Sequence, residues 1–431
     1  MNCAGRDVWK DSELQKKEVN MDNKLRNDAD EIIRACLNAV LPDNAVVRAL
    51  GSLKRTEGKI ILVAAGKAAW QMANAAVNEL GKVDDGIVIT KYEHVMGEIP
   101  GVACYEAGHP VPDENSFIAA SKALELVGSL TEKDTVLFLL SGGGSALFEK
   151  PLVPGEELQD ITRQLLACGA DIVEMNTVRK RLSAVKGGKF ARACAPANVF
   201  SIVLSDILGD PLDMIASGPA YPDSSTCEEA LSIVKKYNLK LSDRAMELLH
   251  QETPKELDNV TTQINGSVRE LCAAAASKCR EMGYTPVLLT DQLSCEAREA
   301  GRFMGSIIRT HAAEGEKTAW IAGGETVVHL TGKGLGGRNQ ELALAAAPAI
   351  AGISGAAVFS VGSDGTDGPT DAAGGYVDGD SLEALSEKGL SVSEVLAQND
   401  AYHALKAVDG LIITGPTGTN VNDVAVALFS R

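Results

Sequence analysis

The sequence predicts an α/β protein in which two mostly parallel sheets are flanked by helices. Short apolar runs alternate along the chain with longer segments that have helical periodicity, a pattern typical of parallel strands joined by helical crossovers. Aromatic residues make up only 4% of the 431 residues, whereas alanine and glycine are abundant. This composition favours close packing of helices on sheets over a β-sandwich. A chain of this length is expected to form two domains or three.

The main domain boundary is predicted near residue 255. Strand-like segments become sparse between residues 207 and 283, and the segment at 251–259 is polar. We therefore expect an N-terminal, Rossmann-like α/β domain over residues 21–255 and a C-terminal α/β domain over residues 256–431.

The helices and strands are assigned from the spacing of apolar residues. Apolar residues that recur on one face indicate a helix, and a short continuous apolar run indicates a buried strand. Helices are expected at 25–50, 67–80, 116–128, 156–173, 177–194, 226–237, 242–250 and 265–282. Strands are expected at 59–66, 86–90, 135–140, 199–206, 285–290, 317–324, 326–332, 356–364 and, as the last one, 411–416. A long loop is expected at 207–226.

Composition and charge exclude several classes of function. The formal net charge is −17, and binding to nucleic acid or to an anionic membrane requires a basic surface, so neither partner is expected. No run of 18 apolar residues is present, so no transmembrane helix is predicted. The nine cysteines are scattered without a C-x-x-C motif, which indicates reduced thiols in a cytoplasmic protein. Residues 1–20 lack the apolar core of a secretory signal and are interpreted as a leader or tag-like extension.

The segment at 134–151 carries the most informative motif. Its apolar run is predicted to be a strand, and it ends in Ser141-Gly142-Gly143-Gly144-Ser145. Glycines let backbone N–H groups approach an anion closely, and the two serine hydroxyls add donors. The loop is therefore predicted to cradle a phosphate group, and the alternative is a flexible surface turn.

Two charged residues follow other predicted strands, and the ligands of α/β sheets bind beyond the carboxyl ends of strands. Lys67 stands at a helix start, where it would bind a carboxylate or a phosphate; the alternative is a solvated lysine. Asp206 ends the strand at 199–206, with Asp210 and Asp213 close behind. A carboxylate there can hold Mg²⁺ or accept a proton from a hydroxyl, and the alternative is an N-cap aspartate.

Basic residues are concentrated at 175–193 in an otherwise acidic protein. A solvated helix face is the usual meaning of such a run. The turn Lys186-Gly187-Gly188-Lys189 interrupts the helical pattern, however, and would help to bind an anionic ligand. Lys186 is therefore included among the predicted nucleotide contacts.

A second glycine-rich segment contains the pattern G-x-G-x-x-G at Gly332, Gly334 and Gly337. This pattern is the dinucleotide-binding fingerprint, but residues 342–363 contain no acidic residue, although a ribose-binding carboxylate is expected about 20 positions after the motif. Arg338 is more informative, because a guanidinium group suits bidentate contacts to phosphate or carboxylate.

Two later segments supply further polar candidates. The loop at 361–375 presents Asp364 and Asp367 either as caps of a turn or as a second carboxylate cluster. Residues 413–428 place Thr419, Asn420 and Asp423 near a predicted helix start, as caps or as contacts to a small molecule. The predicted nucleotide contacts are the loop at 141–145, Lys186, Gly334 and Gly336. The predicted substrate contacts are Lys67, Arg338, Asn339, Thr419 and Asn420. The predicted catalytic residues are Lys67, Asp206, Arg338 and Asp364, and the predicted metal ligands are Asp206, Asp210 and Asp367.

Eight ordered motifs together resemble the class II glycerate kinase (glycerate 2-kinase) family over nearly all of residues 25–431. They include GKAAWQMA at 66–73, SGGGSAL at 141–147, SDILGDPLDMIASGP at 205–219 and GGETVVHLTGKGLGGRNQE at 323–341. The others stand at 108–116, 176–189, 364–374 and 414–423. The resemblance implies phosphorylation of D-glycerate by ATP with Mg²⁺, mainly to 2-phosphoglycerate. It also implies two α/β domains with the active site in the cleft between them.

The resemblance assigns roles to individual residues. Lys67 and Arg338 match the lysine and the arginine thought essential in the family, and Asp206 looks like its strand-tip aspartate. The loop at 141–145 is similar to the family's proposed phosphate-binding loop. Lys67 and Arg338 would neutralise the substrate carboxylate and the transferring phosphoryl group. Asp206 or Asp364 would deprotonate the C2 hydroxyl or hold Mg²⁺.

Two departures from the family pattern and two alternative functions stay open. Arg181 stands where a histidine is common, and residues 148–150 are an unusual exit from the glycine loop that could alter substrate or nucleotide fit. Members of the family have also been labelled hydroxypyruvate reductases, which would require NAD(P)H. A non-catalytic binding protein is the third class. The expected partner is a small-molecule substrate, D-glycerate, and we allow for a homodimer.

Overall fold

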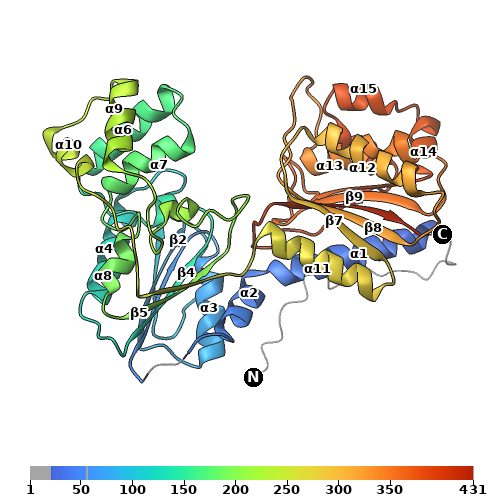
Figure 1. Cartoon of the computed structure of the whole chain (residues 1–431). Coiled ribbons are helices and arrows are strands. Elements are labelled where there is room, and N and C mark those ends of the chain that lie inside the picture. Colours follow the sequence, from blue (N-terminus) through green and yellow to red (C-terminus); the bar gives the residue numbers. More distant parts are fainter. Residues whose placement is uncertain (1–20, 55–56, 431) are drawn as a thin grey trace. The chain divides into compact units, whose positions relative to one another are not determined.

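The computed structural model describes residues 21–54 and 57–430 and divides the chain into two compact units (Figure 1). Residues 42–265 form the N-terminal unit, and residues 266–430 together with helix α1 (Met21–Val40) form the C-terminal unit. The division lies about ten residues beyond the predicted boundary at 255. The first helix also belongs to the other unit, because α1 packs on α11 (Val268–Glu281). The extension predicted at 1–20 lies outside the described residues.

The N-terminal unit is built on a six-stranded sheet of order β3-β2-β1-β4-β5-β6 in which every pair is parallel. The strands are β1 (Ile60–Ala65), β2 (Asp85–Lys91), β3 (Ala103–Ala107), β4 (Thr135–Leu140), β5 (Asn198–Val203) and β6 (Val260–Ile264). This order is that of the Rossmann fold, so the expected Rossmann-like domain is confirmed. Sequence periodicity missed β3 and β6, because these edge strands are only partly buried and lack a continuous apolar run.

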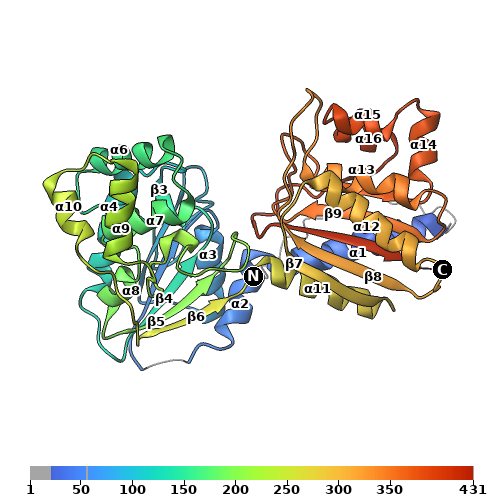
Figure 2. The ribbon, with the colours of Figure 1, turned by 45° about the horizontal axis from the view of Figure 1, so that its top comes forward.

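Helices cover both faces of this sheet (Figure 2). The helices α2 (Pro42–Leu50) and α3 (Ala69–Leu80) pack on one face, and α4 (Glu114–Val127) and α8 (Lys189–Cys194) on the other. A separate apolar cluster joins α6 (Gly155–Ala167), α7 (Ile172–Arg181), α9 (Cys227–Tyr237) and α10 (Asp243–Leu249). The helix predicted at 177–194 is divided, because Gly187 and Gly188 adopt positive φ angles of 58° and 77°.

The C-terminal unit contains a mixed sheet of order β11-β10-β9-β12-β8-β7. The strands are β7 (Thr285–Leu293), β8 (Thr318–Gly324), β9 (Ala356–Gly362), β10 (Gly374–Asp378), β11 (Leu411–Ile412) and β12 (Asp423–Phe429). Four strands run in one direction, whereas β10 and β12 run against them, so that only β7 and β8 form a parallel pair. Helices α1 and α11 lie on one face, and α12 (Ala297–His311) and α13 (Arg338–Ile350) on the other, which confirms the α/β fold (Figures 1 and 2).

Three predicted elements of this unit differ from the structure. The strand expected at 326–332 is a loop with a single bridge between Val327 and Glu296. The strand expected at 411–416 is limited to the two residues of β11. The helix start expected within 413–428 is instead the beginning of β12, a fully buried strand near the centre of the sheet. Its alanine content is typical of a helix, but a strand buried on both faces has no polar alternation to reveal it.

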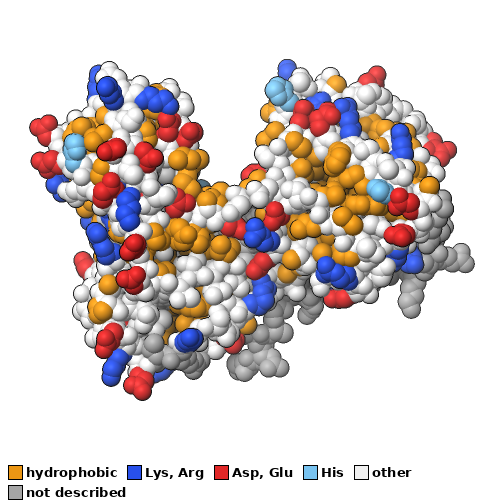
Figure 3. Space-filling view, viewed as in Figure 1, with side chains coloured by type: hydrophobic (Ala, Val, Ile, Leu, Met, Phe, Trp, Pro, Cys, Tyr) orange, Lys and Arg blue, Asp and Glu red, His pale blue; other side chains and the backbone are white. Residues whose placement is uncertain are grey.

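The open edge of the mixed sheet carries exposed apolar side chains. Hydrophobic side chains gather over β7 and α12 (Figure 3), and the exposed ones include Val287, Leu288, Leu289 and Phe303. The homodimer allowed for in the sequence stays a prediction. Among the described residues, no helix is both long and apolar enough to cross a membrane.

Candidate active site

The first candidate region lies at the carboxyl ends of β1 and β4, where the strand order of the parallel sheet reverses. Such a reversal opens a crevice in which α/β proteins bind ligands. Lys67 follows β1, and the loop Ser141–Ser145 follows β4. The two loops are joined, because Lys67 N donates to Gly142 O at 2.9 Å and Ala68 N donates to Ser141 Oγ at 3.0 Å. The lysine and the glycine loop that the sequence singled out therefore lie side by side.

Asp206 lies close to the glycine loop. A Cβ atom on Gly142 would lie 2.3 Å from Asp206 Oδ2, so a larger residue at this position would displace the carboxylate. Asp206 follows β5 by three residues and is partly buried. The structure thus brings the predicted Asp206 to the loop at 141–145, as the shared sheet edge requires.

His109 is a neighbour of this site that the sequence analysis missed. A Cβ atom on Gly143 would lie 3.2 Å from both His109 Nε2 and Lys67 Cγ, so the imidazole and the lysine stem flank the same glycine. Burial, together with the positive charges of Lys67, Lys91 and His94, lowers the pKa of His109. The position of His109 just after β3 was the available signal, but β3 itself was not predicted.

The Lys67 side chain is exposed at the strand tip. Its carbonyl oxygen accepts hydrogen bonds from Thr90 Oγ1 at 3.3 Å and from His94 Nδ1 at 3.1 Å. The backbone of Lys67 is therefore fixed on both sides, while its ammonium group reaches solvent. This arrangement suits a cation that binds an anionic ligand.

Lys186 is not placed where a nucleotide could reach it. Its side chain is fully buried, and Nζ donates to Ser145 O at 2.7 Å and to Phe148 O at 3.2 Å. Nζ also lies 3.1 Å from Glu149 Oε2 in a buried ion pair. Burial lowers the pKa of Lys186 to about 8. Contrary to the predicted nucleotide contact, Lys186 supports the glycine loop from behind, and the unusual residue Glu149 is its partner.

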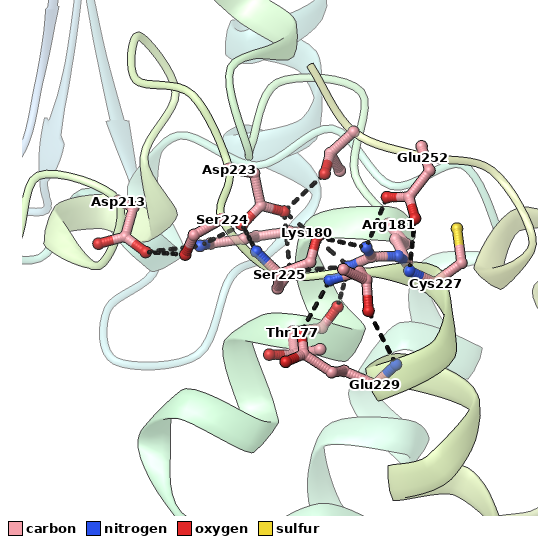
Figure 4. A network of polar contacts seen from close by, with 12 residues as sticks. Thr177, Lys180, Arg181, Asp213, Asp223, Ser224, Ser225, Cys227, Glu229 and Glu252 are labelled. Atoms are coloured by element: carbon pink, nitrogen blue, oxygen red, sulfur yellow. Dashed lines mark hydrogen bonds and ion pairs between the residues drawn. The ribbon is translucent and has the colours of Figure 1, made fainter. Parts of the chain in front are cut away.

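A second buried charge network holds the loop at 207–226 (Figure 4). Lys180 Nζ donates to Asp223 Oδ1 at 2.9 Å and lies 3.7 Å from Asp213 Oδ2. Arg181 donates to Ser225 Oγ at 2.9 Å and to Ser225 O at 2.8 Å. The basic run therefore has buried structural partners rather than a solvated face. Arg181, which departs from the family pattern, ties the far end of this loop to α7.

The second candidate region is a cavity of about 780 Å³ in the C-terminal unit. It lies between the carboxyl ends of β8 and β9 and the start of α13, and Arg338, Asp364 and Asp367 line it. Arg338 makes a bidentate pair with Asp423, at 2.6 Å from Nε and 3.0 Å from Nη2, and Nη1 donates to Glu325 at 3.0 Å. These bonds use three of the five guanidinium N–H groups, so two remain for a ligand.

Burial raises the pKa of Asp423 to about 6, although the adjacent guanidinium opposes this shift. The Arg338–Asp423 pair joins the start of α13 to the start of β12. The sequence analysis named Asp423 only as a cap or a contact to a small molecule. Its pairing with Arg338 was not predicted, because the contact spans 85 residues.

Asp367 and Asn339 have structural partners that occupy their polar atoms. Asp367 is buried, and its carboxylate accepts from Asn339 N at 3.1 Å and Gln340 N at 2.9 Å, so it caps the start of α13. Asn339 is also buried, and its Oδ1 accepts from Ser360 Oγ at 2.5 Å. These contacts do not favour the predicted roles of Asp367 as a metal ligand and Asn339 as a substrate contact.

The remaining predicted residues are divided between the cavity and its surroundings. Gly334 and Gly336 line the cavity, whereas Thr419 is buried, Asn420 is exposed, and neither contributes to the lining formed by the described residues. A Cβ atom on Gly334 would lie 2.4 Å from the Cβ of Asp400. This glycine is thus required by packing against the protein itself, which weakens the dinucleotide interpretation of the motif.

Comparisons with known proteins identify the family of this chain. A family model described as a domain of unknown function, DUF4147, matches residues 28–250, and the MOFRL family model matches residues 318–423. A D-glycerate 2-kinase of Thermotoga maritima is 53% identical over 412 residues, which cover 94% of this chain and 98% of that protein. The chain belongs to the glycerate kinase family.

Other relatives extend and qualify this result. A crystal structure of glycerate kinase from Thermotoga maritima superimposes with a TM-score of 0.90 at 52% identity, covering 94% of this chain and 99% of that chain. A putative hydroxypyruvate reductase of Agrobacterium vitis is 39% identical over 422 residues, covering 93% of this chain and 94% of that protein. The family thus includes members with both names, as the resemblance implied.

Proposed function

We propose that this chain transfers a phosphoryl group from ATP to the C2 hydroxyl of D-glycerate and forms 2-phosphoglycerate. The observation that carries the proposal is the 53% identity to a D-glycerate 2-kinase over 94% of the chain. The strand-tip site supports it, because Lys67, Asp206 and the glycine loop at 141–145 lie together at one sheet edge. The proposal also includes ATP as the phosphoryl donor and the cytoplasm as the location of the enzyme.

Phosphoryl transfer depends on positioning and on neutralisation of charge more than on covalent chemistry. The exposed ammonium group of Lys67 would bind the carboxylate of D-glycerate or the transferring phosphoryl group. Backbone N–H groups of Gly142 and Gly143 would contact phosphate oxygens, since glycine has no side chain of its own to prevent a close approach. Asp206, on the loop that follows β5, lies beside Gly142 and would accept the hydroxyl proton or help to hold the metal.

We propose that two carboxylates of the loop after β5 would hold a magnesium ion. Asp210 Oδ1 is buried and has no hydrogen-bond partner among the described residues, so Asp206 and Asp210 would be its protein ligands. Magnesium usually takes only one or two carboxylates together with phosphate oxygens and water, so the lack of a three-residue cluster among the described residues is consistent with it. When bound, the ion would neutralise charge on the phosphates. Asp367 does not fit, because its oxygens already cap α13.

The geometry does not favour the reductase alternative. The pattern at 332–337 lies on a loop of the mixed sheet, not on the first turn of the parallel sheet where dinucleotide phosphates bind. Gly332 and Gly334 pack against residues 398–400, where a Cβ atom would collide. Their presence is explained by this packing.

The proposal is tested with the full chain, ATP, Mg²⁺ and D-glycerate in a coupled assay, with phosphorus NMR of the product. A 2-phosphoglycerate resonance is the expected result. A 3-phosphoglycerate resonance would retain the kinase and overturn the regiochemistry. Oxidation of NADH by hydroxypyruvate, without phosphorylation of D-glycerate, would replace the kinase by the reductase.

A further inference from the structure

The cavity of the C-terminal unit contains buried polar atoms that lack a protein partner. Glu341 is 1% exposed and Thr326 is 4% exposed, and both side chains line the cavity. Glu341 Oε2 and Thr326 Oγ1 have no hydrogen-bond partner within residues 21–54 and 57–430. Because an unpaired buried polar atom is destabilising, these two atoms are suited to accept a hydrogen bond from a ligand.

The free oxygen of Glu341 is held in a fixed position. Asn399 Nδ2 donates to Glu341 Oε1 at 2.7 Å. Asn399 Oδ1 in turn accepts from Thr331 N and from Gly332 N, both at 2.8 Å, and these residues belong to a loop beside the cavity. One asparagine therefore fixes both the carboxylate and the loop, which leaves Oε2 preorganised for a donor.

The charge of the lining argues against an anionic ligand group. The acidic lining residues are Glu325, Glu341, Asp364 and Asp367. Arg338 is the one cation among the described lining residues, and two carboxylates already pair with it. A carboxylate or triphosphate in this cavity would therefore be repelled, whereas hydroxyl groups would be favoured as donors to Glu341.

The size and the apolar rim narrow the class of ligand. The cavity of about 780 Å³ greatly exceeds the volume of D-glycerate and lies within the range typical of sites for larger ligands. Val327 and Leu330 line it with side chains that are 61% and 79% exposed. Such apolar side chains suit the face of a flat heterocycle.

We propose that this cavity binds the nucleoside part of the nucleotide. Glu341 Oε2 accepts a hydrogen bond from a ribose hydroxyl, as carboxylates do in other nucleotide-binding folds, and Thr326 Oγ1 binds a second polar atom. Val327 and Leu330 contact the base. The inference rests on the proposed function, which identifies the nucleotide as ATP.

The test uses calorimetric titration of the full chain with ADP, 2′-deoxy-ADP and 3′-deoxy-ADP. Wild type is expected to bind ADP about tenfold more tightly than at least one deoxy form, because a hydrogen bond to a charged group is lost. Glu341→Gln keeps the acceptor for Asn399 and removes the charge, so it should bind ADP about tenfold more weakly and lose the discrimination. Leu330→Ala, on an exposed side chain, should weaken all three nucleotides to the same extent.

The matched control is Glu383→Gln on an exposed position of α14 (Ser381–Glu387), which should bind all three nucleotides like wild type. Unchanged ADP affinity or unchanged discrimination in Glu341→Gln would overturn the inference, and so would the absence of ADP binding by wild type. If Glu341→Gln does not fold, the ADP affinities of Thr326→Ala and Leu330→Ala are measured instead. Both variants should bind ADP more weakly than wild type, and wild-type affinity in both would overturn the inference. If ADP binding depends on Glu341 but D-glycerate is not phosphorylated, the nucleoside site is supported, and only D-glycerate as the phosphoryl acceptor is refuted.

Discussion

The two candidate regions differ in their share of cations although both lie at the carboxyl ends of strands. In the N-terminal unit, Lys67 and Lys91 lie near His109, and the glycine loop lies between Lys67 and the carboxylate of Asp206. In the C-terminal unit, carboxylates outnumber the single lining arginine, which is itself paired. The two regions therefore differ in the ligand groups that each would favour, and each can be tested by itself.

The largest expected effect comes from Arg338, whose pair with Asp423 crosses from α13 to β12. Arg338→Ala should lower the free energy of unfolding by about 3–5 kcal/mol, because it leaves the buried Asp423 without its cation. The pKa of Asp423, already about 6, should rise further. Stability tied to a raised carboxyl pKa is present at acid pH and lost as the pH rises through that pKa. The variant should therefore be less impaired at pH 5 than at pH 8.

Chemical denaturation of Arg338→Ala and Arg338→Lys at both pH values measures this effect. Arg338→Lys keeps the charge but cannot form the bidentate pair, so it should lie between wild type and the alanine variant. Equal stability of all three proteins would show that Arg338 does not stabilise the fold through Asp423. Arg338 would then not differ from Lys67 in being held by a structural ion pair.

Lys186 tests whether the buried cations near the glycine loop are structural. Lys186→Met should lower the free energy of unfolding by about 3–5 kcal/mol, since Glu149 would remain buried with its main partner removed. The folded-state pKa of about 8 lies below the ordinary value of 10.5, so the stability of wild type should rise with pH between these values. This rise should be absent from the variant.

The double variant Lys186→Met/Glu149→Leu is the matched control and should recover part of the lost stability. The KM for ATP, measured at low temperature where the variants remain folded, should change little. A large increase in KM without loss of stability would instead restore the sequence-based prediction that Lys186 contacts the nucleotide.

Lys67 tests the positive half of the comparison directly. Lys67→Ala should lower kcat/KM for D-glycerate by about 10²–10³-fold, the range seen when one charge-stabilising donor is removed from an active site. The exposed side chain leaves the melting temperature unchanged. Lys82→Ala, another exposed lysine of the same unit, is the control and should retain full activity. Wild-type kcat/KM in Lys67→Ala would remove the cationic site from the mechanism.

The success of the sequence-based predictions follows from how local each signal is. Strands β1 and β4 were predicted because both faces are buried, and the residues that follow them, Lys67 and Ser141–Ser145, are then placed by topology alone. Strand β12 was mistaken for part of a helix, since its burial depends on helices far away in the sequence. A local pattern therefore predicts which residues follow a buried strand, but not which distant elements pack against that strand.

The partners of charged residues were the least predictable feature. The sequence shows that Lys186 is basic, but not that Glu149, 37 residues earlier, neutralises it inside the protein. Likewise, Asp367 has the residue type of a metal ligand, yet α13 uses its oxygens as a cap. Such pairings span long separations and depend on which groups the fold buries, so no short motif encodes them.

The smallest effect is expected at His109. Its pKa depends on the cations around it, so it tests whether positive charge surrounds the first candidate region. His109→Asn should lower kcat/KM by about tenfold, as expected when one hydrogen-bonding group beside the glycine loop is replaced. Because burial and, after it, nearby cations lower the pKa of His109, wild type should keep this contribution down to pH values below 6.5, the ordinary value. In Lys91→Ala, the loss of a positive charge should raise the pKa and move the acid limb of the pH profile upward. An acid limb at the same pH in both proteins, or wild-type kcat/KM in His109→Asn, would contradict a role for the cationic neighbourhood in tuning this histidine.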